Sequence, residues 1–155
     1  MAKTKLEWEA VNPPLSEPLL RAAETILGVT FPPDYRSLVR VYHGGSPEPS
    51  SFDVSFPTNS YRSCVGILLT PDPRLPESIF SYIANLSEDD QLPEGLVPIA
   101  DDGGGDLVCL DYRGLKRSSS VEPSVVYWAH ELTGPEAICP LAKSFGTFLR
   151  LLGPE

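Results

Sequence analysis

Two apolar runs flank an Asp- and Gly-rich turn, and this pattern constrains the chain most because it predicts an antiparallel strand pair. The runs are residues 96–100 and 107–112, and the turn between them reads Asp101-Asp102-Gly103-Gly104-Gly105. Asp and Gly readily adopt the positive φ angles that tight hairpin turns need. Pro98 cannot donate a ladder hydrogen bond, so we expect its strand to be an edge strand or irregular there. Ser124–Trp128, rich in β-branched and aromatic residues, is predicted to add a third strand to this sheet.

Helical periodicity dominates the N-terminal part and returns at the C-terminus. Ser16 is a candidate N-cap for a first helix, and Gly28 is its stop. Apolar residues at helical spacing predict a second helix over residues 35–42, before Gly44-Gly45. A final helix is predicted from an apolar face that ends before Gly153-Pro154. That face comprises Leu141, Phe145, Phe148, Leu149 and Leu152.

The segment between the helical pair and the central hairpin reads as short elements joined by turns. We expect a Pro- and Ser-rich loop over 46–51, strands at 52–56 and 64–69, and a turn-rich link over 57–62. A third helix is predicted over residues 76–86. The order of elements then predicts an α+β fold, in which an N-terminal helical pair and a C-terminal helix flank a mainly antiparallel central sheet.

The chain has 155 residues, the size of one ordinary domain, and we expect one domain over 1–155 with its core at roughly 16–152. Its apolar runs fall short of the roughly 20 residues of a spanning helix, and residues 1–8 lack the apolar region of a signal peptide. Cys64, Cys109 and Cys139 lie far apart, which is typical of reduced cysteines. We therefore expect a cytoplasmic protein.

The negative charge is concentrated in one stretch. The formal net charge is −9, and residues 72–111 contain ten acidic residues against the single Arg74, a difference that equals the whole net charge. A negative potential repels phosphate, so nucleic acid and anionic membranes are not expected as direct partners. The acidic stretch suits a basic protein partner met through electrostatic steering, or else it serves to solvate loops and keep the chain soluble.

The run 101–106 contains three carboxylates near a flexible backbone, a combination that can ligate a hard cation. The spacing does not match the calcium loop of helix-loop-helix proteins, and a tight strand turn is the simpler explanation. Phosphate binding would need a Gly-Lys-Ser/Thr ending, and the flanking carboxylates would repel the anion. We predict no metal and no cofactor.

Nucleophilic catalysis would need Cys or Ser beside a histidine, and the sequence has two histidines, His43 and His130. Cys139 follows His130 by nine residues, a spacing that neither supports nor excludes contact. Cys109 and Cys139 are more simply small buried hydrophobes. His43, at the end of a predicted helix, is expected to serve the last carbonyls and the helix dipole. We predict no catalytic residues.

Several short motifs follow one another in a recognisable order. Residues 24–36 read ETILGVTFPPDYR, 42–45 read YHGG, 96–111 read LVPIADDGGGDLVCLD, and 126–131 read VYWAHE, ahead of the apolar segment 145–152. Together they resemble the SUKH superfamily, which includes bacterial toxin-immunity proteins and fungal regulators of cell-wall assembly. The chain departs from the family pattern at three positions: His43 replaces the usual Asn, Phe31 replaces a Leu, and Ala129 replaces a frequent Asp.

The resemblance implies an α+β fold and, for bacterial members, a non-enzymatic protein that neutralises a polymorphic toxin, often a nuclease or deaminase. Such toxins tend to be basic because they approach phosphate. Our leading hypothesis is an immunity protein whose acidic surface docks on a basic toxin domain and covers its active site. The predicted partner-binding residues are Glu88, Asp89, Asp90, Asp101, Asp102 and Asp106. The alternative is a regulatory or scaffold protein with an endogenous protein partner.

Overall fold

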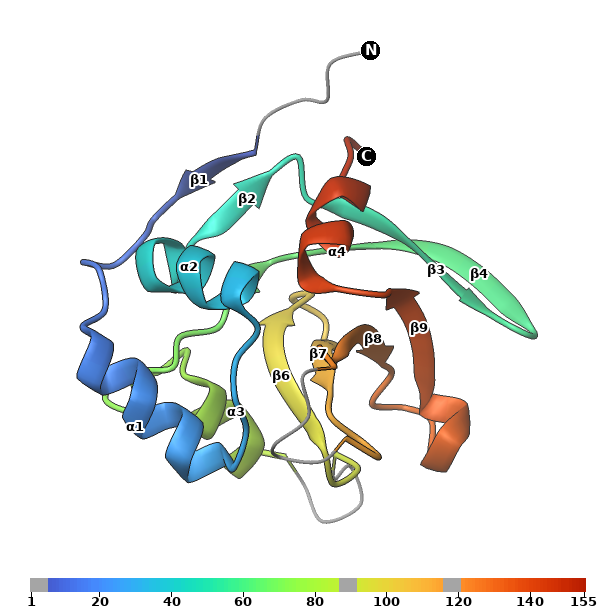
Figure 1. Cartoon of the computed structure of the whole chain (residues 1–155). Coiled ribbons are helices and arrows are strands. Elements are labelled where there is room, and N and C mark those ends of the chain that lie inside the picture. Colours follow the sequence, from blue (N-terminus) through green and yellow to red (C-terminus); the bar gives the residue numbers. More distant parts are fainter. Residues whose placement is uncertain (1–5, 87–91, 116–120) are drawn as a thin grey trace.

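The computed structural model describes residues 6–86, 92–115 and 121–155 (Figure 1). Within these residues the helices are α1 (Glu17–Leu27), α2 (Pro33–Tyr42), α3 (Ile79–Ala84), α4 (Phe145–Leu151) and the 3-10 helix Gly134–Ala137. The strands are β1 (Glu7–Glu9), β2 (Ser46–Glu48), β3 (Ser51–Phe56), β4 (Asn59–Cys64), β5 (Ile67–Leu68), β6 (Leu96–Asp101), β7 (Leu107–Asp111), β8 (Ser124–Trp128) and β9 (Ile138–Ala142). The predicted α+β fold is confirmed.

The central sheet is antiparallel, with the order β5-β6-β7-β8-β9 among the described strands. The predicted hairpin is its middle: β6 and β7 pair from Leu96↔Asp111 to Asp101↔Leu107, and β8 lies next to β7. The register shifts between Pro98 and Ala100, which is the irregularity expected at a proline that cannot donate to the ladder. Strand β6 is not an edge strand, but β5 pairs only with Ala100 and Asp101, so Pro98 lies in the irregular part of β6 beyond that pairing.

Both faces of this sheet are buried, which is why its strands are apolar at nearly every position. One face packs against α1, α2, α4 and β3 in the main core, to which Val97, Ile99, Val108, Leu110, Val125 and Tyr127 contribute. The opposite face forms a smaller cluster against Tyr82 and Leu86. Its buried members are Leu96, Leu107, Cys109, Val126, Trp128 and Ala137. Cys109 and Cys139 are buried, as predicted for small hydrophobes.

The first two helices form where periodicity and capping signals predict them. The Ser16 side chain accepts a hydrogen bond from the Leu19 N–H, and Gly28 ends α1 in the left-handed region at φ 72°. Helix α2 is held against α1 by Arg36, whose guanidinium lies 2.6 Å from Glu17 and 3.2 Å from Glu24. None of the described helices has the length and apolarity that crossing a membrane requires.

The predicted strand at 52–56 is confirmed as β3, but the rest of the prediction for residues 46–69 is wrong in its details. The expected turn over 57–62 is largely strand, because β4 pairs with all of β3 from Phe56↔Asn59 to Ser51↔Cys64. The expected strand over 64–69 is reduced to β5, and the expected loop over 46–51 contains β2, which pairs with β1. In Figure 1 the β3–β4 hairpin projects past β9. Polar residues in β4 hid this strand, since one side of it faces solvent.

Two predicted helices are shorter than expected. Helix α3 begins after Ser78, whose hydroxyl accepts a hydrogen bond from the Ser81 N–H, so Pro76 precedes the helix. The final helix begins after the cap Ser144, and Leu141 lies in β9. Strand β9 was missed because Pro140 interrupts it and because its pairing depends on β8, far from local sequence signals.

His43 does more than serve the end of α2, contrary to expectation. Its side chain is 1% exposed, with Nε2 2.8 Å from the carbonyl oxygen of Pro13 and Nδ1 2.7 Å from Thr70 Oγ1. A carbonyl only accepts, so Nε2 carries the proton and donates to Pro13. In the neutral ring Nδ1 then accepts from the Thr70 hydroxyl, which itself accepts from the Asp72 N–H. The imidazole thus joins three separate segments of chain.

Replacing His43 with Ala should lower the free energy of unfolding by about 2 kcal/mol, because Pro13 and Thr70 lose buried partners. Urea unfolding monitored by tryptophan fluorescence measures the change. Ser37→Ala, on the same helix, touches neither group and is the matched control. An H43A protein as stable as wild type would contradict the bridging role.

Candidate binding groove

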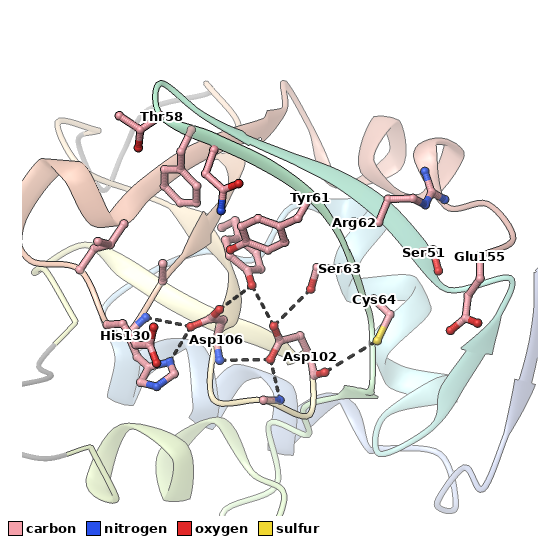
Figure 2. Close-up of a pocket in the computed structure, with 17 residues that line it drawn as sticks. Ser51, Thr58, Tyr61, Arg62, Ser63, Cys64, Asp102, Asp106, His130 and Glu155 are labelled. Atoms are coloured by element: carbon pink, nitrogen blue, oxygen red, sulfur yellow. Dashed lines mark hydrogen bonds and ion pairs between the residues drawn. The ribbon is translucent and has the colours of Figure 1, made fainter.

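A groove of about 840 Å³ lies between β4 and the turn that joins β6 to β7 (Figure 2). Strand β4 supplies one wall, the turn 102–106 supplies the floor, and the segment after β8 supplies the other wall. The polar and charged side chains around it include Arg62, Ser63, Asp102, Asp106, His130, Glu131 and Glu155. Residues from four separate parts of the sequence therefore meet at one site.

The turn fixes the two aspartates of the floor. Asp102 Oδ1 accepts hydrogen bonds from the N–H of Gly104 at 2.8 Å and from the N–H of Asp106 at 3.1 Å. Gly103 and Gly105 adopt φ angles of 80° and 104°, which side chains rarely tolerate. The prediction that Asp and Gly build a tight turn is thus confirmed, and Asp102 holds that turn closed.

The hydroxyl of Tyr127 links the carboxylates of Asp102 and Asp106. It lies 2.6 Å from Asp106 Oδ2 and 2.8 Å from Asp102 Oδ2. Burial, together with the hydrogen bond to Asp106, holds the pKa of Tyr127 well above its usual range, so the phenol keeps its proton. One hydroxyl proton cannot serve two carboxylates at once. The floor therefore has more acceptor capacity than this donor can satisfy.

His130 completes the floor on the side of Asp106. Both its backbone N–H, at 2.9 Å, and its ring Nδ1, at 2.6 Å, lie against Asp106 Oδ1. The carboxylate is the acceptor, so Nδ1 carries a proton. The ring also covers Gly105, where an added Cβ would come within 2.9 Å of His130 Cε1. A glycine at 105 is thus required both by its φ angle and by the imidazole.

The hairpin contributes Tyr61 and Ser63, which point from β4 toward the two aspartates (Figure 2). The Ser63 hydroxyl donates to Asp102 Oδ2 at 3.2 Å. The Tyr61 ring packs edge-to-face on Tyr127, with ring centroids 6.2 Å apart. Arg62 points elsewhere, because its guanidinium donates to Asp53 Oδ1 at 2.9 Å and to the Pro154 carbonyl at 2.8 Å. Arg62 is therefore the one charged side chain that β4 contributes to the groove lining, and its guanidinium is already paired.

The predicted acidic residues do not all reach this groove. Asp102 and Asp106 lie in it, whereas Asp101 accepts hydrogen bonds from the Tyr82 hydroxyl and from the Ile67 N–H on the side of α3. Successive strand residues point to opposite sides, so Asp101 and Asp102 diverge. Glu88, Asp89 and Asp90 lie outside the described residues.

Sequence reasoning missed how Tyr127, His130 and Glu131 complete the acidic site. The signal that brings them there is the register of β7 with β8, because the pair Leu107↔Trp128 carries Asp106 to the start of the 129–132 segment. No three or more His, Cys, Asp or Glu side chains are arranged to hold a metal ion within residues 6–86, 92–115 and 121–155.

The fold and the groove define an α+β protein with an acidic, preformed recess bounded by a projecting hairpin. The sequence profile of the SMI1 / KNR4 family (SUKH-1) matches residues 14–151, and the chain belongs to that family. Membership is consistent with an immunity or a regulatory role. A search among curated proteins finds no match.

Proposed function

We propose that this chain is a non-enzymatic, cytoplasmic immunity protein that binds a polymorphic toxin, a basic nuclease or deaminase domain, and covers its active site. Family membership supports a protein-binding role. The contact surface in this proposal includes Asp101, Asp102 and Asp106, with Glu88, Asp89 and Asp90 as further partner-binding residues. The acidic groove is the central part of that surface.

The observation that carries the proposal is the charge of the groove. Among the residues that the structure describes, four carboxylates line it: Asp102, Asp106, Glu131 and Glu155. The lining also includes two basic residues, Arg62, which is paired with Asp53, and His130, which is paired with Asp106. A basic surface would offset the negative charge of this recess and would be drawn to it from a distance.

The test is calorimetric and kinetic binding to the toxin domain encoded beside the gene, at low and at moderate salt. We expect tight binding that abolishes toxin activity, with an association rate that falls as salt rises. The triple variant D101N/D102N/D106N should associate about tenfold more slowly, provided that thermal unfolding shows it intact. Glu131→Gln, which removes an exposed groove charge, should slow association in the same direction.

Glu7→Gln is the matched control, because it removes one exposed acidic charge from β1, outside the groove. It should leave the association rate close to that of wild type. Equal rates for E7Q, E131Q and the triple variant would remove the groove from the proposal. Failure of the wild-type protein to bind the toxin domain would favour the alternative, a regulatory or scaffold protein with an endogenous partner.

A further inference from the structure

The groove is bounded by a strand with an open edge. Strand β4 pairs with β3 on one side, and no strand among the described residues pairs with its other side. We call that second side the open edge of β4. Five of the six β4 residues line the groove, namely Asn59, Tyr61, Arg62, Ser63 and Cys64. A recess that runs along the unpaired edge of a strand has both the space and the backbone groups to hold another strand.

The register shows which backbone groups point to the open edge. Pro57 and Thr58 form a two-residue hairpin loop, so the closing pair Phe56↔Asn59 exchanges hydrogen bonds, and every second pair after it does the same. The N–H and C=O groups of Tyr61 and Ser63 thus face β3. Those of Ser60 and Arg62 face the open edge.

The opposite side of the hairpin is closed by the chain itself. Ser51 N–H donates to the Gly153 carbonyl at 2.9 Å, and Gly153 N–H donates back at 2.8 Å. The Cys139 thiol donates to the Ser55 carbonyl at 3.1 Å. The C-terminal residues and β9 therefore occupy the outer edge of β3. Within the described part of the chain, the open edge of β4 is therefore the side of the hairpin to which a partner strand can add.

The charge of the groove specifies the side chains of that partner. In a strand added beside β4, alternate side chains would lie on the same side as Tyr61 and Ser63, over Asp102 and Asp106 (Figure 2). Lys or Arg at those positions would give Asp102, Asp106 and Glu131 additional donors. The intervening side chains would lie on the exposed side, beside Ser60 and the Arg62–Asp53 pair.

We propose that the open edge of β4 receives an extended segment of the partner protein as an added strand, with Lys or Arg at alternate positions facing Asp102, Asp106 and Glu131. The inference rests on the proposed function in that the partner is a protein with a basic surface. It adds that this surface includes an extended basic segment bound through its backbone.

The variants Ser60→Pro and Ser60→Ala separate backbone binding from side-chain binding. Proline removes the Ser60 N–H that faces the open edge and places its ring there, while the bonds to β3 made by Tyr61 and Ser63 stay. Alanine removes the same exposed hydroxyl, which contacts Ser55 Oγ at 3.1 Å, but keeps the N–H. Thermal unfolding of both variants shows whether the hairpin persists.

The probe is a phage-displayed library of random 12-residue peptides, selected on the wild-type protein. We expect selected peptides with alternating Lys or Arg that bind wild type and S60A alike and bind S60P about tenfold more weakly. In the wild-type protein the best peptide should slow hydrogen exchange at the Ser60 and Arg62 amides, a measurement that does not depend on the proline variant. A library that yields no such peptide, or peptides that leave these amides unprotected, would overturn the inference.

The toxin domain encoded beside the gene gives the second arm and separates this inference from the proposed function. A toxin that binds wild type, S60A and S60P equally leaves the proposed function in place and overturns strand addition. Selected basic peptides that protect the two amides, together with no toxin binding to wild type, support strand addition and overturn the immunity function. Tenfold weaker toxin binding by S60P, with S60A unchanged, supports both.

Discussion

Phe52→Ala is expected to remove about 3–5 kcal/mol from the free energy of unfolding, which is a large part of the roughly 5–15 kcal/mol of a typical domain. Phe52 is 2% exposed in β3. Its ring packs edge-to-face on Phe148 of α4 at 5.3 Å and on Tyr127 of β8 at 6.0 Å. Truncation leaves a cavity where the hairpin, the last helix and the central sheet meet.

Phe52→Ala should also destabilise the floor of the groove. The Tyr127 ring packs edge-to-face on Phe52, and its hydroxyl contacts Asp102 and Asp106. Loss of the Phe52 ring should therefore make Tyr127, and with it the floor of the groove, more mobile. Urea unfolding followed by tryptophan fluorescence measures the stability, and hydrogen exchange of β4 amides measures the hairpin. We expect faster exchange in β4 at urea concentrations where the variant is still folded.

Ile26→Ala is the control for Phe52→Ala, because Ile26 is 66% exposed on α1 and its truncation should change stability by less than about 0.5 kcal/mol. If the free energy of unfolding of F52A were within about 1 kcal/mol of the wild-type value, the change would be no larger than that of a surface substitution. The hairpin would then not be anchored through this ring.

The central strands could be predicted because local chemistry and burial agree there. Residues in β6, β7 and β8 are apolar at nearly every position, and the turn carries the Gly residues that its φ angles require. Strand β4 carries no such signal. Its sequence is polar, its pairing is set by β3, and the one aromatic side chain in it, Tyr61, packs on Phe56 in the same hairpin and on Tyr127, which is distant in the sequence.

The candidate site could be predicted only in part for a related reason. Charge density pointed to Asp102 and Asp106, but charge alone does not tell which carboxylates share a surface, and Asp101 turned to the other side. Tyr127 and His130 arrive through strand register, which depends on the whole sheet and not on their neighbours in sequence. Residues that strand pairing brings together in the groove can therefore be identified only from a structure.

Asp106→Ala should lower the free energy of unfolding by about 3 kcal/mol, because three donors lose their acceptor in a site where its side chain is 19% exposed. The donors are the His130 N–H, the His130 Nδ1–H and the Tyr127 O–H. Asp106→Asn keeps an acceptor of the same shape and should cost about 1 kcal/mol. Urea unfolding of the two variants measures the difference.

A double-mutant cycle with Tyr127→Phe tests whether Asp106 acts through the floor of the groove. Tyr127→Phe removes the one hydroxyl that both carboxylates approach, so in its presence Asp106→Ala has one bond fewer to lose. The loss in the free energy of unfolding of the double variant should therefore be about 1 kcal/mol smaller than the sum of the losses of the two single variants. Additivity to within about 0.3 kcal/mol would show that the tyrosine and the aspartate stabilise the fold independently, and the floor would then not be a connected unit.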